Sequence, residues 1–261
     1  MNQSKRTIPK VCSAHESRLP LFQPTRRPTR MVARKSESSW GSVTVTGVLG
    51  QGHRDILDAI LVAAEGSHMR EGRLEVLVDQ YQLRSLVSSG RTELPYTHIW
   101  KLLRDLRAAE VVMEMPAMRM RVTDGILAEV VESGTTSGTH PGGFKTKEGG
   151  PRPMLKVTFG RNWTRMLGED IHVDYDLRAV VALRHGAAQA IARFCLSQRE
   201  VHDTLDGLLE KVGYDATDNT PRAVNKLKAE IRGKTGSFAK IEIAITQDGK
   251  VHRSANKRGQ K

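Results

Sequence analysis

Residues 95–109 read PYTHIWKLLRDLRAA, and residues 220–232 read TPRAVNKLKAEIR. Each stretch has a proline at or next to its start, which suits the first turn of a helix because the N–H that proline lacks would have no partner there. Apolar residues then recur every three or four positions, as on a helix with one narrow face in a core: Ile99, Leu102, Leu103 and Leu106 in the first stretch, and Val224, Leu227 and Ile231 in the second. The two stretches therefore predict two similar amphipathic helices.

The outer faces of these two helices carry small, polar or basic side chains. A helix that enters the major groove of DNA needs such a face, because small side chains let the backbone approach while long ones reach base edges and phosphates. Asparagine suits an adenine edge, and arginine or lysine suits guanine or phosphate. The residues that we predict to contact DNA are Thr97, Lys101, Arg104 and Arg107 on the first helix and Arg222, Asn225 and Lys226 on the second.

The same order of elements surrounds both helices: a long apolar helix, a short helix, the helix opened by proline, and two strands. In the first unit the flanking elements are residues 53–64, 81–87, 111–115 and 118–122, and in the second they are residues 177–196, 202–212, 239–246 and 250–254. A short helix followed by a reading helix is the helix-turn-helix order, and the hairpin after it would be a wing that lays Lys250 and Arg253 along the DNA backbone. We therefore predict an α+β fold of two tandem winged-helix domains.

Composition sets the expected domain boundaries. Residues 1–42 are rich in Arg, Pro, Ser and Thr, so we expect them to form a disordered basic tail. The first winged-helix domain is expected over residues 43–150 and the second over residues 151–261. Within the first, residues 133–150 are packed with Gly, Thr and Lys and are too long for a plain connection. They are either a wing extension that contacts DNA or a simple insertion.

The net charge of +12 is concentrated at the two ends of the chain. Residues 1–40 hold nine basic and two acidic side chains, and residues 219–261 hold eleven and three. Basic segments of this kind favour a polyanionic partner, because each phosphate that they neutralise releases condensed counterions. A purely solubilising tail is the alternative.

No motif for catalysis or metal binding stands out. Cys12 and Cys195 have no companion at metal-ligand spacing, so neither a disulfide framework nor a zinc site is predicted, and a reducing, cytoplasmic compartment fits. The nine histidines are scattered without ligand spacing, and no apolar run is long enough to cross a membrane. We expect a DNA-binding protein that is not an enzyme and that needs no cofactor and no metal.

Residues 43–254, in element order and pattern, resemble plasmid replication initiators of the TrfA and IncQ RepC type, which are built from two winged-helix domains. In the tail, Arg18-Leu19-Pro20-Leu21-Phe22 is similar to the Gln-Leu-x-Leu-Phe peptide with which TrfA-like initiators engage the polymerase sliding clamp. Leu19, Leu21 and Phe22 match that peptide, while Arg18 replaces its glutamine.

The resemblance implies a plasmid protein that binds direct repeats (iterons) in double-stranded origin DNA, opens adjacent AT-rich DNA, and recruits the replicative helicase and the sliding clamp. It also implies that the first domain contributes to dimerisation or to contacts with the DNA backbone, while the second makes the sharper base readout. Whether the free protein is a monomer or a homodimer stays open.

Two other classes of function stay open. A transcription regulator with tandem winged helices would use the same residues without melting DNA, and a compact effector pocket or a strong dimer helix would favour it. An enzyme that processes nucleic acid, such as a nuclease, would need a cluster of carboxylates at strand ends. The sequence does not decide which DNA repeat is read or which host factors are engaged.

Overall fold

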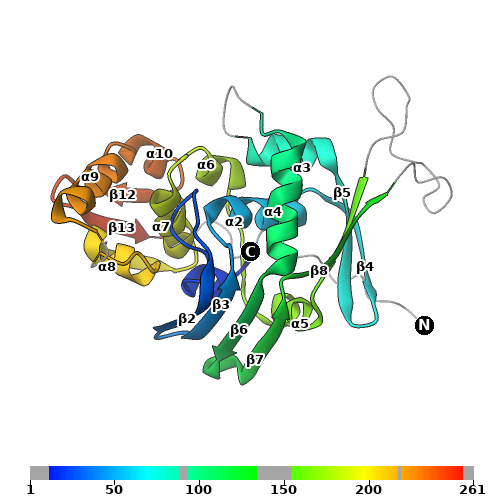
Figure 1. Cartoon of the computed structure of the whole chain (residues 1–261). Coiled ribbons are helices and arrows are strands. Elements are labelled where there is room, and N and C mark those ends of the chain that lie inside the picture. The colour runs from blue at the N-terminus through cyan, green and yellow to red at the C-terminus, as the bar shows by residue number, and fades with distance from the viewer. Residues whose placement is uncertain (1–11, 89–92, 134–153, 217–218, 255–261) are drawn as a thin grey trace, which may run out of the picture.

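The computed structural model describes residues 12–88, 93–133, 154–216 and 219–254. Over these residues the chain forms two units, which lie side by side in Figure 1. The larger unit holds strands β2 to β9 and helices α2 to α5, and the smaller unit holds helices α7 to α10 and strands β11 to β13. Each unit has its own cluster of buried apolar side chains.

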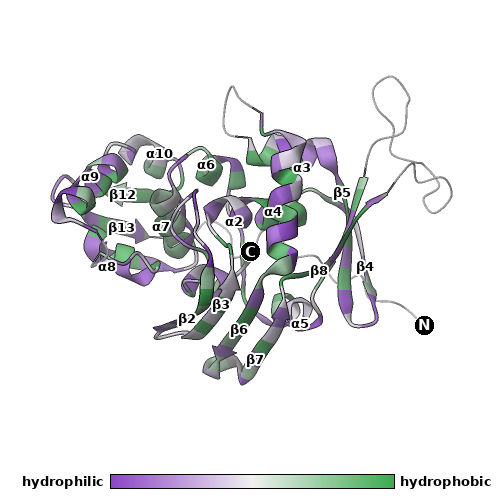
Figure 2. Ribbon diagram, in the orientation of Figure 1, coloured by the Kyte–Doolittle hydropathy of each residue, from purple (hydrophilic) through white to green (hydrophobic). Residues whose placement is uncertain are grey.

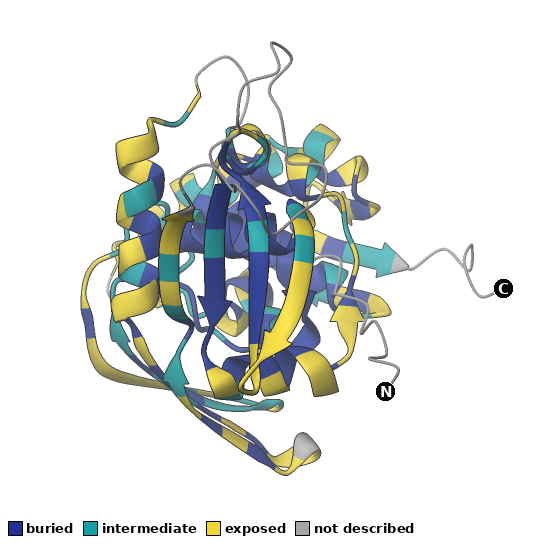
Figure 3. Ribbon diagram, turned by 90° about the vertical axis from the view of Figure 1, so that its right-hand side faces the viewer, coloured by how far each residue is buried: buried dark blue, intermediate teal, exposed yellow. Residues whose placement is uncertain are grey.

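Two four-stranded sheets frame the larger unit, and all their neighbouring strands pair antiparallel. The first has the order β2-β3-β6-β7, and the second has the order β4-β5-β9-β8. Figure 3 looks onto the second sheet, whose inner strands β5 and β9 are mostly buried while its edge strand β4 is mostly exposed. The strand bounds are Met31–Ser38 (β2), Gly41–Gly47 (β3), Ala64–Arg70 (β4), Arg73–Asp79 (β5), Glu110–Met115 (β6), Met120–Gly125 (β7), Leu127–Ser133 (β8) and Met154–Phe159 (β9).

Helix α2 (Gln51–Val62) lies at the centre of the molecule and is buried along nearly its whole length, its charged residues included. Helices α3 (Gln80–Val87) and α4 (Tyr96–Ala108) pack against it, and α5 (Arg161–Glu169) packs against β5 and β7. The predicted helix over residues 95–109 is confirmed as α4, and its four predicted core residues are its buried ones. In Figure 2 hydrophobic and hydrophilic stretches alternate along α4, as expected for a helix with one apolar and one polar face.

The smaller unit is a helical layer on a three-stranded sheet with the order β11-β13-β12. Thr220 caps helix α9 by accepting a hydrogen bond from the N–H of Ala223, and Pro221 occupies the first turn, as predicted. The bounds are Leu177–Val181 (α6, between the two units), Gly186–Leu196 (α7), Glu200–Thr204 (β11), Leu205–Lys211 (α8), Pro221–Arg232 (α9), Thr235–Ala239 (α10), Ile243–Ile245 (β12) and Lys250–Ser254 (β13).

Two predicted helices of the smaller unit differ from the structure. The single helix over residues 177–196 is broken into α6 and α7, because the chain turns through Arg184, whose φ is 55°. The helix over residues 202–212 is shortened, because residues 200–204 form strand β11. Pairing with β13, fifty residues further along the chain, fixes β11 as a strand, and local periodicity carries no sign of that partner.

Residues 12–42 correct the prediction of a disordered tail, whose first eleven residues lie outside the described residues. Strand β1 (Cys12–Ser13) pairs with β10 (His172–Val173), α1 (Ala14–Arg18) follows it, and β2 joins the first sheet. The composition of the whole segment hid a few well-placed apolar residues that reach the core: Leu19, Leu21, Phe22 and Met31.

The predicted domain boundary at residue 150 also needs correction. Strand β9 lies between β5 and β8, and the buried residues of α5 belong to the larger core. The change from one core to the other falls at α6, where Val181 packs in the larger cluster and Val180 in the smaller. The structure describes only the first residue of the predicted 133–150 loop, so the role of that loop stays a prediction.

Candidate nucleic-acid interface

Helix α9 forms one end of the smaller unit, at the far left of Figure 1. Ile231 is its one fully buried residue, and Val224 and Leu227 are half-buried. Two of its polar residues contact neighbouring helices: the half-buried Lys228 pairs with Asp206 of α8, and the exposed Glu230 lies 3.2 Å from the His185 imidazole at the start of α7. These contacts fix which face of α9 turns outward.

The outward face carries the three residues predicted to read DNA, Arg222, Asn225 and Lys226, and all three are exposed. Within the described part of the chain, none of the three has a side-chain hydrogen bond or an ion pair. No acidic side chain among the described residues neutralises the charge of Arg222 or Lys226. All three side chains are therefore available to a ligand. A helix face with this composition suits duplex DNA, where arginine and lysine meet phosphates or guanine and asparagine meets adenine.

The two predicted wing residues, Lys250 and Arg253, lie on the hairpin after α9 but in different environments. Lys250 is exposed beside Asp248, with 3.1 Å between ammonium and carboxylate. Arg253 is half-buried, and its guanidinium donates to the backbone carbonyls of Cys195 and Gln198. Arg253 therefore anchors β13 to the end of α7, whereas Lys250 faces solvent.

Helix α4 carries the predicted residues of the first unit, Thr97, Lys101, Arg104 and Arg107, all of them exposed. The ammonium of Lys101 lies 2.6 Å from the carboxylate of Asp105, which also contacts the His53 imidazole of α2 at 3.1 Å. Burial alone would raise the pKa of Asp105, but hydrogen bonds from Lys101 and His53 hold it below its usual value. Lys101 is thus partly neutralised within the protein, while Arg104 and Arg107 have no ion pair among the described residues.

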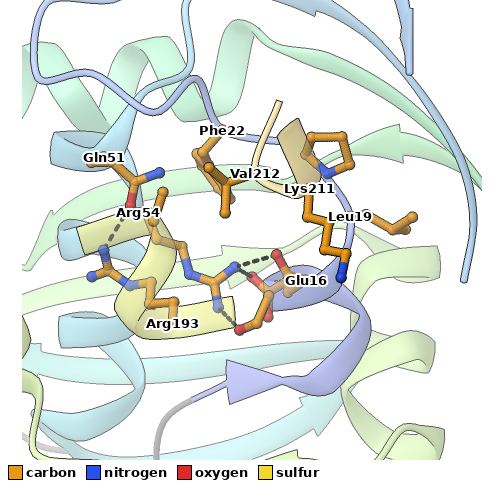
Figure 4. Close-up of a pocket in the computed structure, with 11 residues that line it drawn as sticks. Glu16, Leu19, Phe22, Gln51, Arg54, Arg193, Lys211 and Val212 are labelled. Atoms are coloured by element: carbon orange, nitrogen blue, oxygen red, sulfur yellow. Dashed lines mark hydrogen bonds and ion pairs between the residues drawn. The ribbon is translucent and has the colours of Figure 1, made fainter. Parts of the chain in front are cut away.

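The predicted clamp-binding residues are not presented to a partner. Leu19, Leu21 and Phe22 are only 4%, 0% and 5% exposed, and all three belong to the larger core. Figure 4 shows Leu19 and Phe22 among the residues that line one small pocket, where the Arg54 guanidinium lies 5.4 Å from the centre of the Phe22 ring. Arg18, which replaces the glutamine of the clamp peptide, stacks on Trp40 and donates to the carbonyl of Ser197. In this structure the segment is part of the core and offers no peptide for the clamp.

A buried charged network joins the N-terminal segment to both units, and the sequence reasoning missed it. Arg54 of α2 lies 3.2 Å from the carboxylate of Glu16 and 2.9 Å from that of Asp58. From α7, Arg193 reaches Asp55 at 2.7 Å and Asp58 at 3.0 Å. Burial raises the pKa of Glu16 to about 7 against the opposing charge of Arg54.

The network is a structural joint between the units. The cavity beside it, seen in Figure 4, has a volume of only about 20 Å³, which is room for about one water molecule. The pair Arg54 and Asp58, four residues apart on one helix, is the part that a sequence could have suggested. The link to Arg193, far along the chain, needs the fold.

Among the described residues there is no group of three or more metal-ligand side chains, and no helix there is long and apolar enough to span a membrane. No protein-family profile and no curated protein matches the sequence.

The chain is similar in structure to domains 2 and 3 of RctB. The crystal structure of their selenomethionine derivative aligns with a TM-score of 0.54 at 11% identity, over 96% of this chain and 95% of that one. A second structure, RctB residues 155–483, aligns with a TM-score of 0.49 at 10% identity, over 92% and 95% of the two chains. At such low identity the first match shows a shared fold, a mixed α+β arrangement over nearly the whole chain.

Proposed function

We propose that this chain is a DNA replication initiator that binds repeated duplex sites at an origin. The observation that carries the proposal is the outward face of α9, where Arg222, Asn225 and Lys226 stand exposed on a capped helix and have no partner among the described residues. The shared fold supports it, since RctB is a replication initiator of Vibrio chromosome II.

We further propose that the smaller unit works as a winged helix. Helices α8 and α9 would be the helix-turn-helix pair, with α7 behind them, and the hairpin of β12 and β13 would be the wing. In such a unit the second helix of the pair lies in the major groove and the wing lies along the backbone. The exposed Lys250 near the hairpin turn suits that second contact.

The larger unit would act through α4 in a supporting role. Arg104 and Arg107 are long, exposed and free of acidic partners among the described residues, which suits phosphate contacts that position a protein without reading sequence. Two helices docked in successive major grooves would give two footprints about 10 base pairs apart.

Other parts of the proposal rest on the resemblance to plasmid initiators: binding to iterons, opening of AT-rich DNA, recruitment of the helicase and sliding clamp, and dimer formation. Recruitment of the clamp through Leu19, Leu21 and Phe22 would require this segment to leave the core first. The protein would act by binding, without a cofactor of its own.

The test is binding of the full chain to a duplex that carries its cognate direct repeats, compared with a scrambled duplex. The triple variant Arg222→Ala/Asn225→Ala/Lys226→Ala should lose discrimination between the two. Arg70→Ala/Arg73→Ala removes the same charge at the turn between β4 and β5, at the other end of the molecule in Figure 1, and should leave discrimination intact. Equal discrimination by the triple variant and the wild type would exclude α9 as the reader.

A transcription regulator is the second candidate, and one cleft favours it. A cleft of about 530 Å³ lies between the N-terminal segment and the smaller unit, lined in part by Trp40, Phe194 and Glu200, and is large enough for an effector. Reactivity of origin thymines to permanganate separates the two functions, because an initiator makes AT-rich DNA single-stranded and a regulator leaves it paired.

A further inference from the structure

His202 and His252 stand directly opposite each other on two paired strands. His202 lies on β11 and His252 on β13, and they are partners in the antiparallel register. Their Nδ1 atoms are 3.1 Å apart, and the rings meet edge to face with their centres 5.4 Å apart. Fifty residues separate the two histidines in the chain, so sequence spacing does not reveal the pair.

The separation of the two nitrogens matches that of two ligands on one metal ion. With zinc–nitrogen bonds of about 2.05 Å, two ligands lie about 2.9 Å apart at a right angle and about 3.4 Å apart at the tetrahedral angle. The observed 3.1 Å falls between these values. We propose that His202 and His252 form a two-histidine site for a divalent transition-metal ion, each binding through Nδ1.

The site is open to solvent on one face of the sheet. His202 is exposed and His252 is half-buried, and Ala244, the partner of His252 on β12, adds only a methyl group beside it. No third protein ligand completes the site among the described residues, so water or an outside ligand fills the other coordination positions. His202 also borders the 530 Å³ cleft, through which such a ligand can approach.

Without metal, one neutral imidazole donates its Nδ1–H to the Nδ1 of the other. When an ion binds, the donor ring takes the tautomer that carries its proton on Nε2, and two coordinate bonds from the Nδ1 atoms replace the hydrogen bond and tie β11 to β13. Strand β11 leads directly into α8, and β13 belongs to the hairpin after α9. An ion that joins the two strands therefore stabilises the smaller unit. Copper(II) should bind more tightly than zinc, as expected for nitrogen ligands.

The test is calorimetric titration of the metal-free full chain with Zn²⁺ alone. We expect one saturable site in the wild type and a rise in melting temperature with zinc. His202→Ala and His252→Ala should each weaken binding about tenfold or more and abolish the thermal shift. His68→Ala removes another exposed histidine, on β4, and should change neither result.

Circular dichroism of each variant shows whether it is folded, and His202→Gln and His252→Gln, which keep a side chain of similar size, repeat the test if an alanine variant unfolds. Unchanged zinc affinity in a folded His202/His252 double variant would overturn the proposal. So would the absence of saturable binding to the wild type at zinc concentrations up to about 100 µM. Both outcomes are independent of DNA binding.

Discussion

Helices α4 and α9 have almost the same sequence pattern but stand in different surroundings. Helix α4 buries four apolar residues among α2 and the strands of the larger unit, and Asp105 ties Lys101 to His53. Helix α9 buries Ile231 alone and presents a face whose polar residues have no partner in the described structure. The same amphipathic pattern thus gives one helix that is packed into the larger core and one helix that is mostly exposed on the smaller unit.

Under the function that we propose, this difference gives the two helices different tasks. A helix that enters a groove must have an accessible outer face. Its polar side chains must also be unpaired within the protein, so that base edges and phosphates can serve as their partners. Helix α9 meets both demands, while α4 offers mainly two arginines. We therefore expect α9 to carry sequence discrimination and α4 to carry stability and non-specific affinity.

The largest expected effect lies in the joint between the units that carry these helices. Arg193→Ala should lower the free energy of unfolding by about 3–5 kcal/mol, because Asp55 and Asp58 stay buried with one cation fewer, Arg26 and Arg54 being the cations that they keep. Urea denaturation measures the loss. Arg165→Ala, which breaks an exposed pair with Glu169, is the control and should cost under about 1 kcal/mol. Equal losses would show that the joint contributes nothing special.

The next effect compares the two helices directly. Leu103→Ala in α4 should cost about 2–5 kcal/mol of stability, since Leu103 is fully buried. Leu227→Ala in α9 should cost about 1 kcal/mol, because this leucine is only half-buried. Chemical denaturation of both variants tests the contrast, and a larger loss in α9 would reverse the assignment.

DNA binding should show the opposite contrast. Asn225→Ala should cost about 1–3 kcal/mol on the cognate site and relax the preference at one base pair, as measured by a scan of single base-pair changes. Arg104→Ala/Arg107→Ala should weaken binding to all sequences alike and reduce the salt dependence by about two counterions. A loss of base preference in the α4 variant would contradict this division.

The smallest effect concerns two histidines that touch an acid on these helices, His53 beside α4 and His185 beside α9. Burial lowers the pKa of both below 6.5 despite their acidic partners, Asp105 and Glu230. The unfolded chain therefore binds more protons as the pH falls below 6.5, and stability declines in that range.

His53→Gln should flatten this pH dependence more than His185→Gln, because His53 is almost fully buried and His185 is partly exposed. Urea midpoints between about pH 5 and pH 7.5 measure it. Identical slopes for both variants and the wild type would show that neither histidine contributes.

The sequence predicted what local patterns encode. The start, end and buried face of α4 and α9 follow from a proline, a cap and apolar spacing, and both helices are where they were expected. Local patterns could not predict contacts between residues that are far apart in the chain. These include the pairing of β11 with β13, the position of β9 between β5 and β8, and the burial of Leu21. Composition averaged over 42 residues predicted that the N-terminal segment is a tail, although apolar residues and partnered arginines hold residues 12–26 against the two units.

The same limit applies to the sites. Exposed residues on α9 were found because helical spacing shows which side chains share a face. Arg253 was expected to be free, but it lies within reach of carbonyls at the end of α7, which only the fold brings near. His202 and His252 were passed over because their neighbourhood exists only across strands.

Cross-linking from a single cysteine on α9 shows whether this helix lies in the major groove of the cognate repeat. Burial raises the pKa of Cys12 and Cys195 to about 12, so these two thiols should resist labelling under conditions that label an exposed cysteine. A photoactivatable group on Asn225→Cys should cross-link to bases in the major groove of the cognate repeat, while the same group on Arg73→Cys, at the far hairpin, should not. If Asn225→Cys gives no base cross-links, or none beyond those of Arg73→Cys, α9 does not lie in the groove and is not the helix that reads the repeat.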